Sequence, residues 1–392
     1  MSRTVIVAGS RTPIGKLSGS LASLRAVDLG AHAVAATLAR AGVAPDAVDA
    51  VVMGHVLQAG TGQISARQAA VGGGVPMSVH ATTVNKVCLS GLQSLYLADL
   101  MIRSGDADVV IAGGMESMTN APYLLPGARG GYRYGDQTVV DSLLHDGLTC
   151  SFDHCAMGVA TERYNAGQFS RARQDEFAAR SHQLAAAAQA NGFFDVEIAP
   201  LTITPRKGDP IVLTSDEGVR ASTDAASLAR LSPAFAPDGT ITAGNASQIS
   251  DGGAALLVMS ADRAAALGCE VLGELVSYGQ VAGPDASLLH QPAHAIREAA
   301  RRGHVDVRDF SFVEINEAFA TVALASMDEL GLDESSVNPN GGAIALGHPI
   351  GMSGTRLALT ALYELRRRGG GMAAVSLCGG GGQGDAAVLL VR

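Results

Sequence analysis

The chain has 392 residues, a length that predicts two or three packed units rather than one ordinary domain. Apolar residues make up 47% of the chain and charged residues 17%, which excludes a disordered protein and favours a compact α/β enzyme. A net charge of −9 excludes a nucleic-acid-binding protein, because no basic stripe is present to neutralise phosphates.

Two features of the sequence bear on where the protein acts. The N-terminal residues enter a strand-like run at once and lack the pattern of a signal peptide. No stretch of about 18 apolar residues is present that would cross a membrane. We therefore expect a cytoplasmic protein that does not associate with membranes.

The first third of the chain alternates between strand and helix patterns. Apolar runs at 4–9, 47–57 and 106–114 predict buried strands, and the run at 26–42 has helical periodicity. Such alternation predicts a parallel or mixed sheet with helices on both faces.

Cys88 stands where a further helix pattern begins. The leucines at 89, 92 and 95 mark one buried helical face and place Cys88 in the first turn. Unpaired N–H groups and the helix dipole favour an anion there, so a thiol at this position can have a lowered pKa and act as a nucleophile. A buried structural cysteine is the alternative that this stretch alone leaves open.

Residues 119–249 differ in composition from the first third of the chain and predict an inserted loop domain. They are rich in Gly and Pro, and the stretch 170–192 predicts a long amphipathic helix that ends at Asn191 and Gly192. Cys150, His154 and Cys155 offer three metal ligands without an obvious fourth, so we expect no metal site.

The last third of the chain returns to the first pattern. A strand pattern at 311–315, a leucine-patterned helix at 353–369 and an apolar strand that ends in glycines at 372–384 parallel elements of the first third. We therefore predict two pseudo-symmetric α/β halves with mixed sheets covered by helices. One half comprises 1–118 with 250–270, and the other comprises 271–392.

Three polar positions of the last third are candidates for chemistry. Cys378 ends an apolar strand and is followed by four glycines, which would let backbone N–H groups approach a bound group closely. His348 lies in a glycine-rich loop, where an imidazole could serve as base for a thiol. Asn316 ends another strand. The alternatives are a flexible glycine turn, a structural histidine, and an asparagine that caps the following helix.

Taken together, these stretches resemble the thiolase family, in order and spacing, over essentially the whole chain. The stretches that carry the resemblance are NKVCLSGLQSL, GGMESMTNAP, TAGNAS, NEAFA, NPNGGAIALGHPIGMSGTR and LCGGGGQG. The sequence looks most like the acetyl-CoA C-acetyltransferase branch of that family.

The resemblance implies a role for each catalytic candidate. Cys88 would take an acyl group from coenzyme A (CoA) as an enzyme thioester, and His348 would accept its proton. Asn316 and His348 would hold the thioester oxygen of the bound acyl-CoA, with an ordered water between Asn316 and that oxygen. Cys378 would remove a proton from the α-carbon of the second acetyl-CoA. The N–H groups of Cys88 and Gly380 would form a second oxyanion hole.

The resemblance also implies contacts with the substrate. Ser247 would bind the pantetheine chain of CoA, while Arg220 and Ser227 would lie near its nucleotide end. Met157 and Phe319 would line the thioester pocket. CoA and acyl-CoA would be substrates, with no permanently bound cofactor. The loop at 130–149 resembles a segment that joins tetramers, so we expect a homotetramer, with a dimer as the alternative.

Three positions depart from the family pattern. Ala156 stands where short-chain biosynthetic members commonly have His, Leu288 replaces a frequent Met, and Asp385 stands where the family generally has an uncharged residue. The first two concern the acyl or pantetheine pocket and bear on the preferred acyl-chain length.

The resulting expectation is a reversible Claisen condensation of two acetyl-CoA to acetoacetyl-CoA and CoA. A broader 3-ketoacyl-CoA thiolase of fatty-acid breakdown is the first alternative. A thiolase-like protein that binds CoA or lipid without turnover is the second. Cys378 argues against a decarboxylating ketoacyl synthase, which uses Cys-His-His or Cys-His-Asn.

Overall fold

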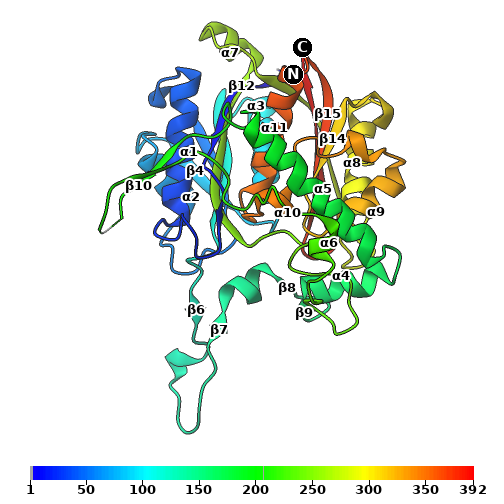
Figure 1. Ribbon diagram of the computed structural model, residues 1–392. Helices are drawn as coiled ribbons and strands as arrows, with labels where there is room; N and C mark the ends of the chain where they lie inside the picture. Colours follow the sequence, from blue (N-terminus) through cyan, green and yellow to red (C-terminus); the bar gives the residue numbers. More distant parts are fainter. Residues whose placement is uncertain (1–2, 206) are drawn as a thin grey trace.

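One large mixed sheet runs through the computed structural model, which describes residues 3–205 and 207–392 (Figure 1). Its strands follow the order β14-β15-β16-β13-β1-β12-β5-β3-β4, and the short strand β2 (Gly15–Lys16) pairs with β12. The N-terminal half supplies β1 (Thr4–Arg11), β3 (Ala50–Gly54), β4 (His80–Val84), β5 (Val109–Ser117) and β12 (Ser250–Ser260). The C-terminal half supplies β13 (Gly273–Ala282), β14 (Phe312–Ile315), β15 (Gly371–Gly379) and β16 (Gln383–Val391).

The two halves of the sheet repeat one pattern, which confirms the predicted pseudo-symmetry. β3 pairs in parallel with β4 and β5, and β12 is antiparallel to β5 and β1. In the other half β14 pairs in parallel with β15, and β16 is antiparallel to β15 and β13. A parallel bridge from Val313 to Val337 takes the place of β4. The halves join where β1 meets β13, so the sheet is continuous rather than divided in two.

Helices cover the sheet on both sides, as the alternating pattern predicts. The helices α3 (Ser90–Ser104) and α11 (Ser353–Arg367) share one hydrophobic core between the two halves. Figure 1 shows α1 (Ala26–Ala41) and α2 (Ser65–Gly72) on one outer side, and α8 (Gln291–Gly303) and α9 (Ala320–Leu330) on the other. The short helices α7 (Ala261–Ala266) and α10 (Ala343–Leu346) connect larger elements. None of the helices in the described residues is long and apolar enough to span a membrane.

The central helices approach each other closely because glycines lie at their contact. A β-carbon on Gly91 of α3 would be 2.9 Å from the backbone nitrogen of Thr355, and one on Gly354 of α11 would be 2.7 Å from the Leu92 side chain. Leu89, Leu92 and Leu95 are all fully buried, as their spacing predicts. The N-terminal ends of two helices from different halves are thereby brought together.

A segment between β5 and β12 surrounds one end of the sheet. It holds three two-stranded sheets, β6 (Tyr123–Leu124) with β7 (Val140–Asp141), β8 (Thr149–Cys150) with β9 (Cys155–Ala156), and β10 (Leu201–Ile203) with β11 (Ile211–Leu213). Its helices are α4 (Met157–Asn165), α5 (Arg171–Ala190) and α6 (Ala225–Leu228). The end of α5 agrees with the predicted stop at Asn191. Figure 1 shows the hairpin of β6 and β7 extending well away from the body.

A buried cluster of charged side chains links the segment between β5 and β12 to β1. Arg11 of β1 donates to Asp216 through two nitrogens, at 2.7 and 2.9 Å, and to Glu197 at 2.8 Å. All three side chains are buried, so each charge depends on the others for compensation.

Candidate active site

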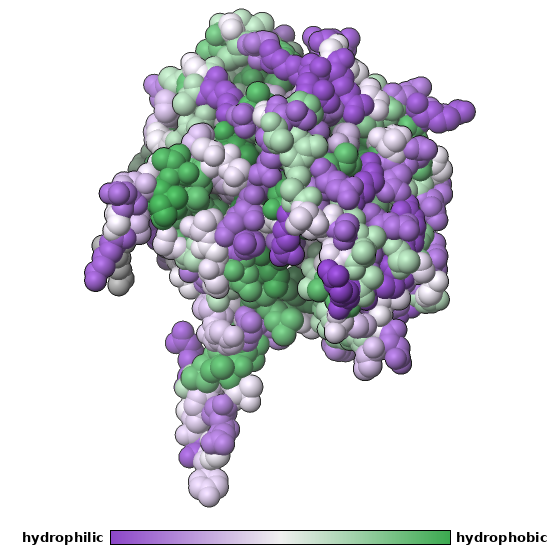
Figure 2. All heavy atoms as spheres, viewed as in Figure 1, coloured by the Kyte–Doolittle hydropathy of each residue, from purple (hydrophilic) through white to green (hydrophobic). Residues whose placement is uncertain are grey.

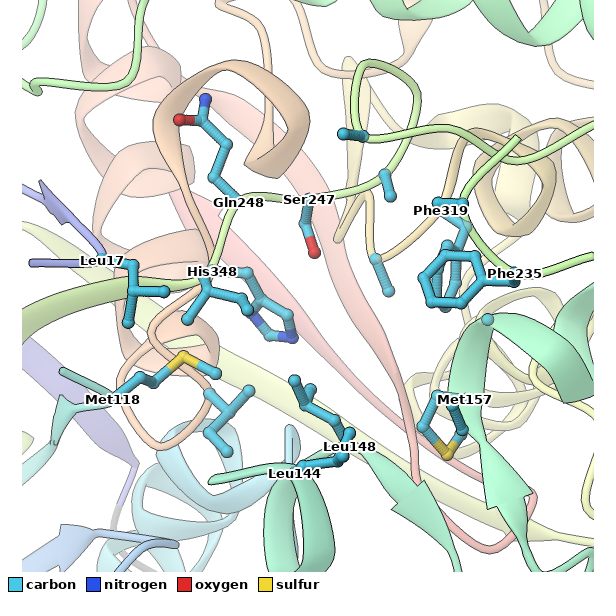
Figure 3. Close-up of a pocket in the computed structure, with 18 of the residues that line it drawn as sticks. Leu17, Met118, Leu144, Leu148, Met157, Phe235, Ser247, Gln248, Phe319 and His348 are labelled. Carbon is cyan, nitrogen blue, oxygen red and sulfur yellow. The ribbon is translucent and has the colours of Figure 1, made fainter. Parts of the chain in front are cut away.

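Two adjoining cavities open where the segment 119–249 meets the ends of the sheet. The outer cavity has a volume of about 510 Å³ and is mostly apolar, with Met118, Leu148 and Phe235 in its wall. The inner cavity measures about 280 Å³ and is lined by Cys88, Cys378 and Gly380, among others. Figure 3 shows the outer cavity, with the ring of His348 pointing into it. The two cavities share part of their walls: Leu148, Met157, Ser247, Ala318, Phe319, His348 and Ile350.

Cys88 lies before the helix rather than in its first turn. The helix α3 begins at Ser90, and Cys88 follows a tight turn in which Val87 has a left-handed φ of 50°. The N–H groups of Cys88 and Gly380 favour its thiolate, but burial outweighs them and raises the pKa of Cys88 to about 12. The expectation of a lowered pKa is therefore wrong, because loss of solvent outweighs the local N–H groups.

His348 is a buried side chain in the loop between α10 and α11. Its Nδ1 lies 2.6 Å from the Ser353 hydroxyl, which itself donates to the Pro349 carbonyl at 2.9 Å. This pattern assigns the proton to Nδ1 and leaves Nε2 free to accept, 3.3 Å from Nδ2 of Asn316. Burial, with Arg356 nearby, lowers the pKa of His348 to about 3. The resting imidazole is therefore neutral and can act as a base.

Asn316 follows the last residue of β14 and is fully buried. Its Oδ1 has no partner among the described protein groups, while its amide nitrogen faces His348. The residue before α9 is Phe319, so Asn316 is not the cap of that helix. The capping alternative is therefore wrong.

The loop that carries His348 fits into a slot of small residues. β-carbons placed on Gly54 or Gly91 would come within 2.7 and 2.9 Å of the Gly351 carbonyl oxygen. These glycines belong to β3 and α3, so only residues without side chains let the loop approach the half of the fold that carries Cys88. The local sequence thus sets the distance between His348 and the start of α3.

Glu116 holds the same loop from the other side. Its carboxylate accepts N–H groups from Gly351 at 2.9 Å, and from Val56 and Leu57 at 3.1 Å each. His55 lies 3.4 Å away. Burial raises the pKa of Glu116 to about 8, and these three donors oppose that rise. Glu116 therefore joins loops from both halves of the chain.

Cys378 is the last residue but one of β15 and is 1% exposed. Burial raises the pKa of Cys378 above its usual range, and the neighbouring Cys88 adds to the rise. In the glycine run that follows, Gly381 and Gly382 have left-handed φ values of 80° and 68°. At Gly380 a β-carbon would meet only Val87, at 3.6 Å. Backbone conformation therefore explains two of the four glycines, and Gly380 instead directs its N–H to the Cys88 sulfur.

Comparison with known families agrees with this geometry. Residues 4–262 match the N-terminal domain of thiolase, and residues 269–391 match its C-terminal domain. The chain belongs to the thiolase family.

Three curated relatives place this thiolase more closely. A protein of Mycolicibacterium smegmatis named "Probable acetyl-CoA acetyltransferase" is 56% identical over 98% of this chain and 100% of its own length. The "Acetyl-CoA acetyltransferase" of Cupriavidus necator is 47% identical over 98% of both chains. A Staphylococcus aureus protein named "Probable acetyl-CoA acyltransferase" is also 47% identical, over 99% of both.

The structure brings most of the predicted substrate residues of this thiolase together. Ser247, Met157 and Phe319 line both cavities, and Leu288 lines the inner one. Arg220 and Ser227 are not among the described residues of either wall. The backbone N–H of Arg220 donates to His182, and Ser227 forms a capping box at the start of α6. Their predicted contacts with the nucleotide end of CoA stay predictions.

Residues 150–155 lie in the hairpin formed by β8 and β9. Within the described part of the thiolase, no three His, Cys, Asp or Glu side chains are grouped so that they could hold a metal ion. Cys150 instead lines the inner cavity, and Cys155 receives a hydrogen bond from Arg163.

Sequence reasoning missed two residues of this thiolase site. Ser353, which fixes the tautomer of His348, lies five residues after it in the same glycine-rich motif. Glu116 stands in the GGMES motif, whose spacing indicated a glycine turn after a strand but no partner for the carboxylate. Only the fold reveals that this carboxylate contacts a loop 235 residues further along the chain.

Proposed function

We propose that the chain is a CoA-dependent acyltransferase that condenses two acetyl-CoA molecules to acetoacetyl-CoA and CoA, and catalyses the reverse cleavage. The observation that carries this proposal is the pair of cysteines in the wall of one cavity. One sulfur faces N–H donors, and the other lies beside the first in a nearly solvent-free environment. A neutral His348 lines the same wall.

The first half of the reaction acylates Cys88. Its sulfur attacks the carbonyl carbon of the bound thioester, and its proton passes to Nε2 of His348. The bond between that carbon and the CoA sulfur breaks, and the departing thiolate takes the proton of Cys378. Developing negative charge on the carbonyl oxygen would be held by fixed N–H donors, each of which is worth roughly 3–4 kcal/mol in such sites.

The second half forms the carbon–carbon bond. The Cys378 thiolate removes a proton from the α-carbon of the second acetyl-CoA, and the resulting carbanion attacks the acyl carbon on Cys88. The bond to the Cys88 sulfur breaks, and the sulfur recovers its proton from His348. Both cysteines and the imidazole end in their starting protonation states. Burial suits these steps, because water in the site would protonate the carbanion before it could attack the acyl carbon.

A broader 3-ketoacyl-CoA thiolase of fatty-acid metabolism is the second candidate, and the inner cavity favours it. Its wall is formed not only by Cys88 but also by Leu148, Cys150 and Phe152, so the cavity borders the hairpin of β8 and β9. Ala156 lines the adjoining outer cavity, where a larger side chain would take up space. Both observations support room for acyl chains longer than acetyl.

The decisive experiment measures CoA-dependent cleavage of 3-ketoacyl-CoAs of four to sixteen carbons. Wild type is compared with Cys88→Ser and with the control Cys269→Ser, whose thiol lies outside both cavities. A strong preference for four carbons, lost only in Cys88→Ser, supports the acetyltransferase. Equal or higher rates on long chains support the second candidate. No cleavage by wild type at any length contradicts both, and favours a binding protein without turnover.

We also propose that the enzyme is a homotetramer joined through the hairpin of β6 and β7. Leu125 and Val139 on this hairpin are 48% and 54% exposed, and Figure 2 shows a hydrophobic band across the projection. Such a band on an extended arm is typical of a protein interface. Light scattering on wild type and on Leu125→Asp tests this, with four copies expected for wild type and two for the variant. Identical masses contradict it.

A further inference from the structure

Asp385 is a buried charge close to the catalytic cysteines. It lies on β16 with 0% exposure, and its strand neighbour Gly384 pairs with Cys378 of β15. A carboxylate in such a position is costly unless it is paired and hydrogen-bonded. Burial raises the pKa of Asp385, while the partners around it oppose that rise.

Lys86 supplies the pairing charge. Its Nζ lies 2.7 and 2.9 Å from the two carboxylate oxygens of Asp385, so one ammonium bridges both. The hydroxyl of Tyr278 donates to the same carboxylate at 2.9 Å, and the Tyr278 ring stacks on Tyr96 with centroids 4.4 Å apart. The side chain of Lys86 is only 20% exposed. The side chain of Gln280 adds a further hydrogen bond, so the carboxylate is held by three donors.

Lys86 is also part of the turn that sets the position of Cys88. Its backbone N–H donates to the Ser90 hydroxyl at 2.8 Å, and its carbonyl accepts from the Leu89 N–H at 3.2 Å. Between Lys86 and Cys88 stands Val87, in the left-handed conformation. The main chain of Lys86 is therefore fixed to the start of α3, while its side chain is fixed to β16.

We propose that Asp385 is a positioning residue for the acyl transfer. By binding Lys86, it holds the Cys88 turn of one half against the strand pair of the other half that carries Cys378 and Gly380. The N–H of Gly380 then stays directed at the reacting sulfur and its acyl group. This inference rests on the proposed function, because it assigns a role in acylation of Cys88.

The alternative is that Lys86 and Asp385 form a structural ion pair that does not influence the reaction. Buried pairs can often be replaced by apolar residues with little loss of stability, whereas removal of one partner leaves a costly unpaired charge. A double replacement therefore separates the two readings. Lys86→Met with Asp385→Leu restores charge balance but removes the link between the two halves.

The test compares Asp385→Asn, Lys86→Met and the double variant with wild type and with the control Asp306→Asn, an exposed carboxylate paired with Arg308. Three quantities are measured on each: kcat and KM for cleavage, thermal unfolding, and the pH profile of Cys88 alkylation by iodoacetamide. We expect Asp385→Asn to lower kcat about 100-fold, the usual cost of a displacement of about 1 Å at a reacting group.

The pH profile distinguishes positioning from general loosening. Loss of the Asp385 charge leaves the Lys86 ammonium uncompensated, which favours the thiolate, so the profile of Asp385→Asn shifts to lower pH. In the double variant the profile returns to that of wild type and unfolding recovers, but kcat stays low. Wild-type kcat in the double variant, or in Asp385→Asn, overturns the proposal.

The same experiment separates this proposal from the proposed function. Mass spectrometry after incubation with acetyl-CoA reports whether wild-type Cys88 gains an acetyl group. No acetylated wild type overturns the acyltransferase itself. Acetylated, active wild type together with an equally active Asp385→Asn overturns only the positioning role.

Discussion

Gly54, at the end of β3, is the position where one added methyl group would test the geometry of the site most directly. A β-carbon there would lie 2.7 Å from the Gly351 carbonyl oxygen and 2.7 Å from the Ser90 carbonyl carbon. The first atom belongs to the loop of His348, and the second to the start of the helix that follows Cys88. Gly54→Ala would therefore push the loop of His348 away from the start of α3.

The size of the effect follows from the shortfall in space. Each contact would be 0.7 Å short of the 3.4 Å at which ordinary contact begins, and both obstacles are backbone atoms that cannot rotate away. A separation of about 1 Å between reacting groups typically costs about 100-fold in rate. Overpacking of this kind costs about 1–3 kcal/mol in the free energy of unfolding.

The assay is kcat/KM for acetoacetyl-CoA cleavage, with urea unfolding measured in parallel. Gly130→Ala is the matched control, because its β-carbon would meet no atom within 4 Å. We expect about a 100-fold loss for Gly54→Ala and none for the control. If Gly54→Ala kept more than half of the wild-type kcat/KM, the slot would not set the distance between His348 and Cys88.

Three more outcomes are expected. Gly380→Ala should keep most of the cleavage activity, because its β-carbon has space. Gly382→Ala should lose that activity, because Gly382 has a φ of 68° and its β-carbon would collide with a backbone carbonyl. Equal cleavage rates for the two variants would count against this reasoning. Arg11→Met should lower the urea-unfolding free energy by about 3–5 kcal/mol, because two buried carboxylates lose their cation. Arg308→Met removes an exposed pair and should leave that free energy nearly unchanged. Because the pKa of Cys88 is about 12, its thiolate fraction and iodoacetamide inactivation should rise about tenfold per pH unit from pH 6 to 9, and a plateau below pH 8 would refute the burial effect.

Much of the fold could be predicted because its signals are local. Apolar runs gave β1, β3 and β5, and the leucine spacing after Cys88 gave the buried face of α3. The repeat of the last third was visible as a second strand, loop, helix and strand in the same order. The union of the two halves into one sheet was not, because strand partners distant in the chain leave no local trace.

The site divides in the same way. The ordered motifs identified Cys88, His348, Cys378 and Asn316. The first three line the inner cavity, and Asn316 contacts His348 from behind its wall. The pKa of Cys88 could not be judged from its place near a helix start, since the burial that raises it comes from distant elements. Contacts such as those of Glu116 depend on the tertiary fold alone.

The repeat of the sheet has a consequence for how the catalytic roles are divided. Cys88 lies two residues before α3 and His348 lies five residues before α11, so the proposed nucleophile and base lie on the loops that lead into corresponding helices of the two halves. Glu116 and Cys378 are each the last residue but one of corresponding nine-residue strands, β5 and β15.

The same holds for the residues that directly follow β3 and β14, which are His55 and Asn316. On each of these pairs of corresponding elements the two copies carry different side chains, and at least one of the two is a proposed reacting group or its direct partner. Two identical subunits related by symmetry would have to present the same side chain twice. One chain that contains both copies can place different side chains at corresponding positions, as the proposed reaction with its two unequal substrates requires.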